Sequence, residues 1–269
     1  MNTELSILIE RLNDPVFVKT DVITWGCPVP SFGNLASAKI ATLGLNPSNR
    51  EFVDERGKEL EGAKRRFHTL NSLGLQQWSD AKENHLSSIL DLCKQYFFRN
   101  PYDGWFKKLD NIISGTSLSY YFPSAGACHL DLIPYATSCK WTELNFQQRS
   151  LLLDLAGDTL GLLLKNSSIK LLILNGQTVV ENLQRISNVV LQKTHKPEWT
   201  LPRKSNDGVL GYAYIGFIEN IGGIDLERKI HVLGYNHNIQ SSFGVTTQVQ
   251  RNIRNWVSDL AKEVLHETC

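Results

Sequence analysis

The sequence predicts an α/β fold: one three-layer α/β/α domain over residues 1–269, with a mostly parallel central sheet. Three observations lead to this prediction. Short apolar runs recur along the chain, amphipathic helical segments separate them, and no repeat or Pro/Ser-rich linker interrupts the order. Strands that alternate with helices favour a sheet covered on both faces, and ligands bind such sheets at the carboxyl ends of the strands.

The apolar runs have the length and composition of buried strands. They cover residues 39–43, 129–133, 169–174, 212–218 and 230–233. The stretch 193–207 is polar and contains proline, and it is therefore expected to form a long surface loop.

Helical periodicity marks the segments between and around these runs. They cover residues 2–12, 84–98, 104–113, 146–164, 178–186 and 246–265. In the last segment apolar residues recur at spacings of three and four, which places them on one stripe that packs against a core. They are Val249, Ile253, Trp256, Val257, Leu260, Ala261 and Val264.

Composition is that of an intracellular globular protein. The chain has 269 residues, 42% of them hydrophobic, which is enough to bury one sizeable core. No run of about 18 apolar residues occurs, and the charged, amphipathic start does not resemble a secretory signal. We therefore expect a cytoplasmic protein with no membrane span, and we predict no obligatory protein partner.

The cysteines lack the paired spacing that zinc and iron–sulfur sites usually show. They are Cys27, Cys93, Cys128, Cys139 and Cys269. They are expected to be reduced thiols, and neither a metal site nor a cofactor is predicted.

The formal net charge of +1 excludes a polycation that coats nucleic acid indiscriminately, so any DNA contact must be local. Short basic clusters are candidates for such contacts, although clusters of this size are often solvated surface. They are Lys64 with Arg65 and Arg66, Lys107 with Lys108, Arg203 with Lys204, and Arg251 with Arg254.

The first informative loop follows the strand 39–43 and reads Gly-Leu-Asn-Pro-Ser from Gly44 to Ser48. Gly44 permits a close backbone approach, and Pro47 fixes the turn after Asn46. An amide that projects from a rigid turn can position a water or bind a sugar oxygen. The same residues also fit a simple turn without a site.

The second loop follows the run 129–133. Alternation places His129, Asp131 and Ile133 on one face, so an acid lies in an otherwise apolar strand and close to its end. A buried carboxylate is costly unless it is paired. Asp131 therefore either serves a site or caps a neighbouring helix or loop.

The third loop, 234–244, precedes the final helix and is rich in amides and hydroxyls, with one imidazole, His237. Such groups ahead of a helix N-terminus suit a phosphate or a developing anion. The alternative is an N-cap with a solvent-exposed histidine.

Together the three loops resemble the signature motifs of the uracil-DNA glycosylase superfamily, whose fold has four parallel strands with helices on both sides. The run 44–48 is similar to the Gly-x-Asn-Pro-Gly motif of its mismatch-specific, thymine and single-strand-selective branches, with Ser48 in place of the second glycine. Asp131 stands where the family has the base-reading Asn. The run 237–241 resembles the His-Pro-Ser loop, with Asn238 and Ile239 in place of Pro and Ser.

The resemblance implies an enzyme that flips a base out of DNA and hydrolyses its N-glycosidic bond. Asn46 would hold the water and His237 would stabilise the departing base. Base contacts are expected from Gly44, Asp131 and either Phe52 or Phe67 as the stacking ring, with Ile239 or Gln240 as the wedge. DNA contacts are expected from Ser48, Arg66, Asn238, Ile239, Gln240, Ser241 and Ser242.

Asp131 bears on the choice of base, because a carboxylate only accepts hydrogen bonds and its natural partner is an exocyclic amine such as cytosine N4. Excision of ordinary cytosine would destroy the host genome. The prediction is therefore a modified cytosine, and bacterial anti-phage glycosylases similar to this superfamily remove glucosylated hydroxymethylcytosine from phage DNA.

Three alternatives remain open at this stage. One is a repair glycosylase for uracil or hypoxanthine, and another is a non-catalytic DNA-binding protein with the same fold. The third is a nucleotide-binding α/β protein of another class, which the absence of glycine-rich phosphate-binding signatures disfavours. The glycosylase hypotheses rest on the expectation that the side chains of Asn46, Asp131 and His237 converge on one pocket.

Overall fold

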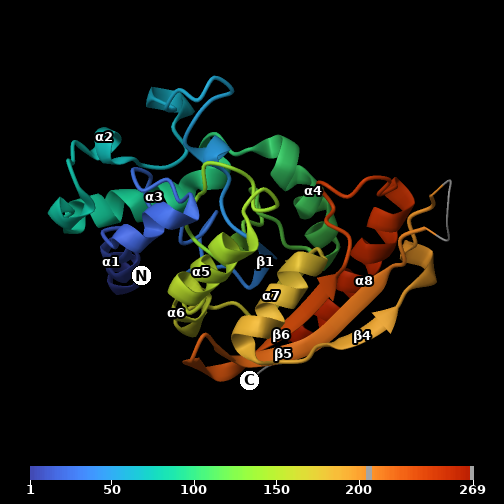
Figure 1. Cartoon of the computed structure of the whole chain (residues 1–269). Coiled ribbons are helices and arrows are strands. Elements are labelled where there is room, and N and C mark those ends of the chain that lie inside the picture. Colours follow the sequence, from blue (N-terminus) through green and yellow to red (C-terminus); the bar gives the residue numbers. More distant parts are fainter. Residues whose placement is uncertain (204–207, 267–269) are drawn as a thin grey trace.

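A six-stranded sheet forms the centre of the computed structural model, which describes residues 1–203 and 208–266 (Figure 1). The strands are β1 (Ile40–Gly44), β2 (Ala127–Asp131), β3 (Leu171–Asn175), β4 (Gln192–His195), β5 (Tyr212–Ile221) and β6 (Ile224–Tyr235). Their order across the sheet is β2-β1-β3-β6-β5-β4. The first four strands in this order are parallel neighbours, and β5 and β4 continue the sheet antiparallel.

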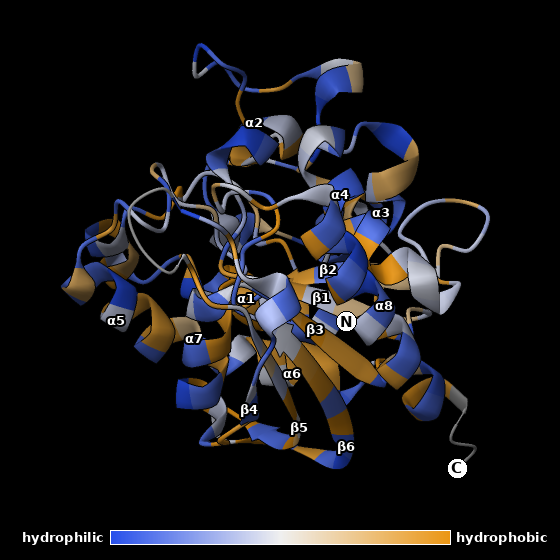
Figure 2. Ribbon diagram, turned by 90° about the vertical axis from the view of Figure 1, so that its right-hand side faces the viewer, coloured by the Kyte–Doolittle hydropathy of each residue, from blue (hydrophilic) through white to orange (hydrophobic). Residues whose placement is uncertain are grey.

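Helices cover both faces of the sheet. The α-helices of the described residues are α1 (Asn2–Arg11), α2 (Leu70–Leu73), α3 (Glu83–Arg99), α4 (Asp103–Ile113), α5 (Phe146–Ala156), α6 (Thr159–Lys165), α7 (Gln177–Ser187) and α8 (Thr247–His266). Short 3-10 helices lie at Pro15–Thr20, Asn49–Glu51, Gly62–Lys64, Trp78–Asp80, Ser114–Thr116 and Pro197–Trp199. Figures 1 and 2 show α5 and α7 on one face and α4 and α8 on the other.

This arrangement confirms the predicted α/β domain with a mostly parallel sheet flanked by helices. Every residue of β1, β2 and β3 is buried, as expected for central strands covered on both faces. In Figure 2 the hydrophobic colour concentrates on these strands and on the helix sides that face them. On α8, Val249, Ile253, Val257, Ala261 and Val264 are buried in the core, which confirms the predicted stripe.

Two predicted elements were wrong in extent. The predicted helix 146–164 is divided, because α5 ends before Gly157, a poor helix former, and α6 starts after Asp158, whose carboxylate pairs with Arg11 at 2.7 Å. The predicted loop 193–207 contains most of β4 and a 3-10 helix that buries Trp199. The side chains of β4 are all exposed, so no apolar alternation marked the strand. Residues 204–207 of that prediction, including Lys204 of one basic cluster, lie outside the described residues.

Among the described residues, no helix combines the length and apolar character that a membrane crossing requires. Cys27, Cys93, Cys128 and Cys139 are free thiols, and Cys269 lies outside the described part of the chain.

Candidate functional site

A cavity of about 720 Å³ opens at the carboxyl ends of β1, β2 and β3, where the fold predicts ligand binding. Its volume lies within the range of roughly 300–1,000 Å³ that is typical of small-molecule sites. Three loops line it: the one that follows β1, the one that follows β2, and the one between β6 and α8. The residues of the predicted site that line the cavity are Gly44, Asn46, Ser48, Asp131, Asn238 and Ser241.

The orientation of the Asn46 side chain is fixed by acceptors in the wall. Its Nδ2 donates to the Thr137 hydroxyl at 2.9 Å and to the backbone carbonyls of Pro47 and Tyr135 at 3.2 and 3.4 Å. Carbonyl oxygens only accept, so the amide nitrogen must face them. The amide oxygen of Asn46 is therefore the atom available to a ligand, and it can accept a hydrogen bond from a water.

Asp131 is buried in the cavity wall beside His129. Its Oδ1 lies 3.4 Å from Nε2 of His129. On the other side of the ring, Nδ1 lies 2.7 Å from the Thr42 hydroxyl, and that oxygen lies 2.5 Å from the hydroxyl of Tyr120. A proton on Nε2 suits the carboxylate and leaves Nδ1 to accept from Thr42, which in turn accepts from Tyr120. The hydrogen bonds thus run in one direction, from Tyr120 to Thr42, from Thr42 to His129 and from His129 to Asp131.

Gly44 makes room for this pair. A Cβ atom at position 44 would clash with Oδ1 of Asp131 and would lie 3.0 Å from Nε2 of His129. The predicted close backbone approach at Gly44 thus serves the neighbouring strand β2. With Oδ1 enclosed in this way, Oδ2 is the carboxylate oxygen left for a ligand.

His237 does not join the cavity, which corrects the expected convergence. The ring is 2% exposed, and Nε2 lies 2.7 Å from the backbone oxygen of Trp199, so Nε2 carries a proton and donates. Burial lowers the pKa of His237 below its usual value, which favours the neutral form of the ring. Asn238, the next residue, lines the cavity instead.

The loop after His237 is held by Asn175, at the end of β3. Its amide oxygen accepts from the backbone N–H of Ile239 at 3.0 Å, and its nitrogen donates to the side-chain oxygen of Gln240 at 2.6 Å. Ile239 is 3% exposed. Neither predicted wedge residue is therefore free to enter a duplex, because one is buried and the other is tied to the sheet.

The Asn238 side chain is oriented in the opposite sense to Asn46. Its Oδ1 accepts from the backbone N–H groups of Gln240 and Ser241 at 3.0 and 3.1 Å. Nδ2 is thus the end of the amide that can donate to a ligand. Ser241 lines the cavity nearby, whereas the backbone N–H of Ser242 donates to the backbone oxygen of Asn238 at 2.8 Å.

Phe52 and Phe67, the predicted stacking rings, lie in the core. Both are 1% exposed, and their ring centroids are 5.9 Å apart within an aromatic cluster. The aromatic rings that do line the cavity are Trp105 of α4 and Trp141 of the loop after β2. Trp105 packs edge-on against His129 at 5.1 Å and thus stands beside the Asp131 pair.

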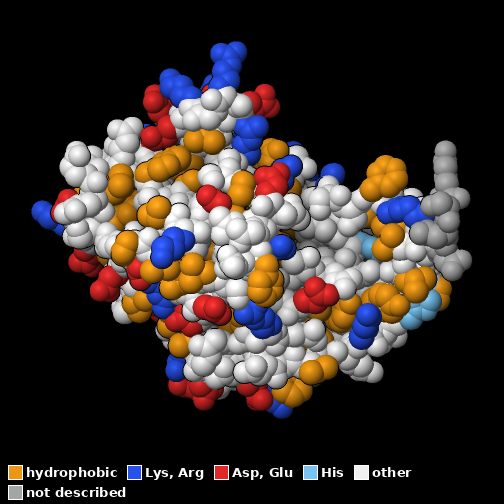
Figure 3. Space-filling model, viewed as in Figure 1, with side chains coloured by type: hydrophobic (Ala, Val, Ile, Leu, Met, Phe, Trp, Pro, Cys, Tyr) orange, Lys and Arg blue, Asp and Glu red, His pale blue; other side chains and the backbone are white. Residues whose placement is uncertain are grey.

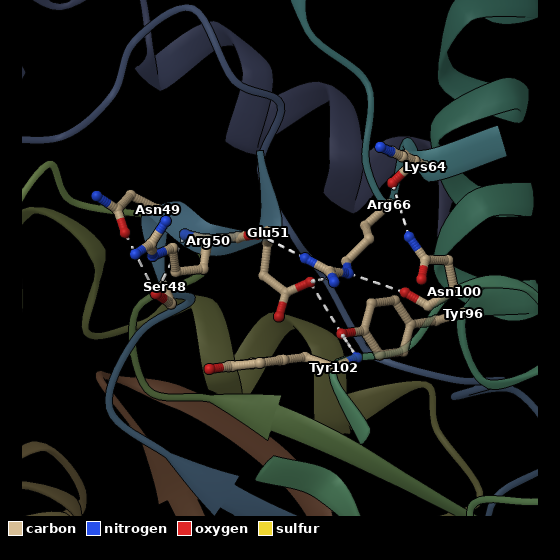
Figure 4. Close-up of polar contacts among 9 residues, drawn as sticks. All are labelled: Ser48, Asn49, Arg50, Glu51, Lys64, Arg66, Tyr96, Asn100 and Tyr102. Atoms are coloured by element: carbon tan, nitrogen blue, oxygen red, sulfur yellow. Dashed lines mark hydrogen bonds and ion pairs between the residues drawn. The ribbon is translucent and has the colours of Figure 1, made fainter. Parts of the chain in front are cut away.

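Arg66, predicted to contact DNA, supports the loop after β1 from behind (Figure 4). It donates to the backbone oxygens of Arg50 and Asn100 at 2.7 and 2.8 Å, and Nε lies 3.9 Å from the buried carboxylate of Glu51. The Tyr96 hydroxyl donates to the same carboxylate at 2.8 Å. Burial raises the pKa of Glu51 to about 7 despite these partners.

Charge in the cavity wall is more acidic than basic. Carboxylates come from Asp54, Glu55, Asp131 and Glu143, and cations from Arg50 and Lys140. Such a wall favours a ligand rich in hydrogen-bond donors over a phosphate. Ser48 lies at the rim, exposed, and accepts from the backbone of Arg50 at 3.2 Å.

Within residues 1–203 and 208–266, no cluster of three or more His, Cys, Asp or Glu side chains is arranged to hold a metal ion. In comparisons with known proteins, the chain matches no protein-family model and no curated protein. The likeness to uracil-DNA glycosylases therefore rests on the strand-end motifs.

Sequence reasoning missed Trp105, Trp141 and Asn175. Asn175 could have been found, because it is a polar residue directly after an apolar strand. Trp105 and Trp141 carried no such signal, since a tryptophan in a helix or loop is more often part of a core.

Proposed function

We propose that this protein is a monofunctional DNA glycosylase that flips a modified cytosine out of DNA and hydrolyses its glycosidic bond, leaving an abasic site. The observation that carries the proposal is the meeting of Asn46 and Asp131 in one cavity at the carboxyl edge of the sheet. One side chain offers an amide oxygen for water, and the other offers a carboxylate oxygen for an amine.

Base recognition falls to Asp131. Because Oδ1 faces His129, Oδ2 is left to accept from the exocyclic amine of a cytosine-type base. A uracil edge presents a carbonyl at the same place, which a carboxylate repels. A cavity of about 720 Å³ leaves room beyond a base for a bulky substituent, such as the glucosylated hydroxymethyl group of phage DNA.

Hydrolysis needs a water, a stabilised sugar cation and a stabilised leaving base. The glycosidic bond breaks with its electron pair moving to the base, water adds to the sugar carbon, and the proton lost by that water balances the proton gained by the base. Asn46 has no group basic enough to remove a proton, so its role is to hold the water in position.

Because His237 lies outside the cavity, the expected convergence is reduced to Asn46 and Asp131, and Asn238 takes the role that the resemblance implied for His237. Its Nδ2 can donate to an oxygen of the departing base, as its Oδ1 is already engaged by the loop. A neutral amide stabilises an anion less than an imidazolium would, so a modest rate is expected.

Phe243 is the best candidate for the wedge that fills the space left by the flipped base. It lies on the same loop as Asn238 and is 82% exposed. Trp105 is the candidate ring for stacking against the base inside the cavity.

A panel of oligonucleotides tests the proposal. Each carries one base: cytosine, hydroxymethylcytosine, glucosylated hydroxymethylcytosine, uracil or hypoxanthine, and alkali cleavage reports abasic sites. We expect release of the modified cytosine and a loss of about 100-fold or more in Asn46→Ala, with DNA binding retained. Release of uracil or hypoxanthine alone would favour the repair alternative, and binding without release of any base would favour a non-catalytic protein.

A further inference from the structure

Strands β5 and β4 extend the sheet beyond the four parallel strands, and the start of β5 and the end of β4 lie at the edge where the cavity opens. β6 ends at Tyr235, which is in register with Ala213 at the start of β5. His195, the last residue of β4, is in register with Tyr212. The topology thus brings the end of β4 beside the loop that supplies Asn238 to the cavity.

Hydrogen bonds join this extension to the cavity loop. Asn236 accepts from the backbone N–H of Tyr212 at 2.8 Å and donates to the backbone oxygen of Leu210 at 2.8 Å. Further out, the Arg203 guanidinium donates to the backbone oxygen of Phe243 at 2.8 Å and lies 5.2 Å from the centre of its ring. The loop that supplies Asn238 to the cavity is therefore in direct contact with the start of β5 and with Arg203.

This surface is locally basic. Between residues 192 and 203 the sequence places Lys193, Lys196 and Arg203 against a single carboxylate, Glu198, in a chain whose net charge is only +1. All four side chains of β4 are exposed. Figure 3 shows Lys, Arg and His side chains beside hydrophobic ones over β4 and the loop that precedes α8.

The cations are held along aromatic rings. Nζ of Lys193 lies 3.9 Å from the centre of the Tyr212 ring, and the His195 ring packs against the same tyrosine at 5.5 Å. Nζ of Lys196 lies 5.9 Å from the Trp199 ring. Trp199 is 1% exposed and Tyr212 is covered by Lys193 and His195, so these rings hold the cations in place, and a base would meet Phe243, which is 82% exposed.

We propose that this surface, defined by Lys193, His195, Lys196, Arg203 and Phe243 and named here the β4 track, binds the DNA strand that flanks the flipped nucleotide. The proposal rests on the proposed function and adds to it the place where the phosphates lie. The cavity wall is too acidic to take them, whereas the β4 track is basic and adjoins the rim. The cations would contact phosphates, and Phe243 would contact a base.

Binding of an unmodified, fluorescently labelled dT oligonucleotide tests the β4 track without any base excision. We expect the triple variant Lys193→Gln, Lys196→Gln and Arg203→Gln to bind about tenfold more weakly, and the slope of log affinity against log salt to flatten by about 2, since each single-strand phosphate contact contributes about 0.7. These side chains lie on the surface, and thermal unfolding verifies that the triple variant is folded.

Lys229→Gln is the matched control. Lys229 also lies over an exposed ring, 4.5 Å from the centre of Phe217, but in the middle of β6, six residues before its end at Tyr235. Its substitution is expected to change the affinity less than twofold.

Wild-type affinity and salt slope in the triple variant would overturn the proposal. So would displacement of the oligonucleotide by an equal concentration of polyglutamate, which would indicate a site for acidic peptides. Base excision is scored separately on the panel above. Excision by the wild type together with unchanged binding in the triple variant would support the glycosylase and contradict the β4 track. Weaker binding in the triple variant without excision by the wild type would support a DNA-binding surface at the β4 track and contradict the glycosylase.

Discussion

Nε2 of His129 lies 3.4 Å from Oδ1 of Asp131, and both side chains are buried. This contact determines which oxygen of Asp131 can meet a base, and it also fixes how an amide at position 131 would orient. An asparagine there would turn its oxygen toward the His129 N–H and its NH₂ group toward the cavity.

The Asp131→Asn variant is therefore expected to reverse the base preference. Release of the modified cytosine should fall by about 10- to 100-fold, since a hydrogen bond to a charged group contributes roughly 1.5–3 kcal/mol. Uracil, with a carbonyl at the same edge, should become a better substrate than it is for the wild type. Single-turnover rates on both oligonucleotides measure the change, and an unaltered ratio would contradict the role given to Asp131.

Gly44 is expected to be intolerant of a methyl group. In Gly44→Ala the new Cβ would clash with Oδ1 of Asp131 and lie 3.0 Å from Nε2 of His129. Neither buried group can yield easily, so we expect a loss of about 1–3 kcal/mol in unfolding free energy together with loss of base release.

Gly104→Ala is the control for this substitution, because a Cβ at position 104 meets nothing within 4 Å. Gly104 lies in the first turn of α4, where alanine is the better helix former. Urea titration of both variants gives the comparison, and equal stability in the two would count against the close fit at Gly44.

The pH dependence of stability should carry a contribution from Glu51. Burial raises its pKa in the folded protein to about 7, above the ordinary value of 4.5. Between these values the folded protein keeps the proton and the unfolded chain releases it, so stability falls as the pH rises through this window. The fall from this one group is roughly 3 kcal/mol, at 1.36 kcal/mol for each pH unit.

Glu51→Gln cannot ionise, so it should lose this slope between pH 4.5 and 7. Urea titrations at four pH values across the window, with Glu10→Gln as the exposed-carboxylate control, give the measurement. Parallel slopes in wild type and Glu51→Gln would show that the folded protein does not hold the proton.

Local sequence patterns predicted the parallel part of the fold because its strands are uniformly apolar and its helices amphipathic. β4 was missed because all four of its side chains are exposed, and its existence depends on pairing with β5. Asn46 and Asp131 were found because strand ends of a parallel sheet meet at one edge. His237 was misplaced for a different reason: sequence shows that a histidine follows β6, but only packing shows that its ring turns toward Trp199.

The last prediction concerns the loop between β6 and α8, on which Phe243 replaces Ile239 as the proposed wedge. Ile239 is 3% exposed, and Phe243 is 82% exposed. Phe243→Ala should leave stability within about 0.5 kcal/mol of wild type, because the ring buries little surface. Release of the modified base from duplex DNA should fall by about tenfold, which corresponds to about 1.4 kcal/mol of lost support for the flipped state.

The same substitution should matter less on single-stranded DNA, where no partner strand refills the space left by the base. Phe122→Ala is the matched control, because Phe122 is 78% exposed but precedes β2 and so lies toward the opposite edge of the sheet. Ile239→Ala, in contrast to Phe243→Ala, should lower the free energy of unfolding by about 2–5 kcal/mol because it leaves a cavity in the core. If Ile239→Ala kept full stability but released the base more slowly from duplex DNA, and Phe243→Ala did not, Ile239 would be the wedge.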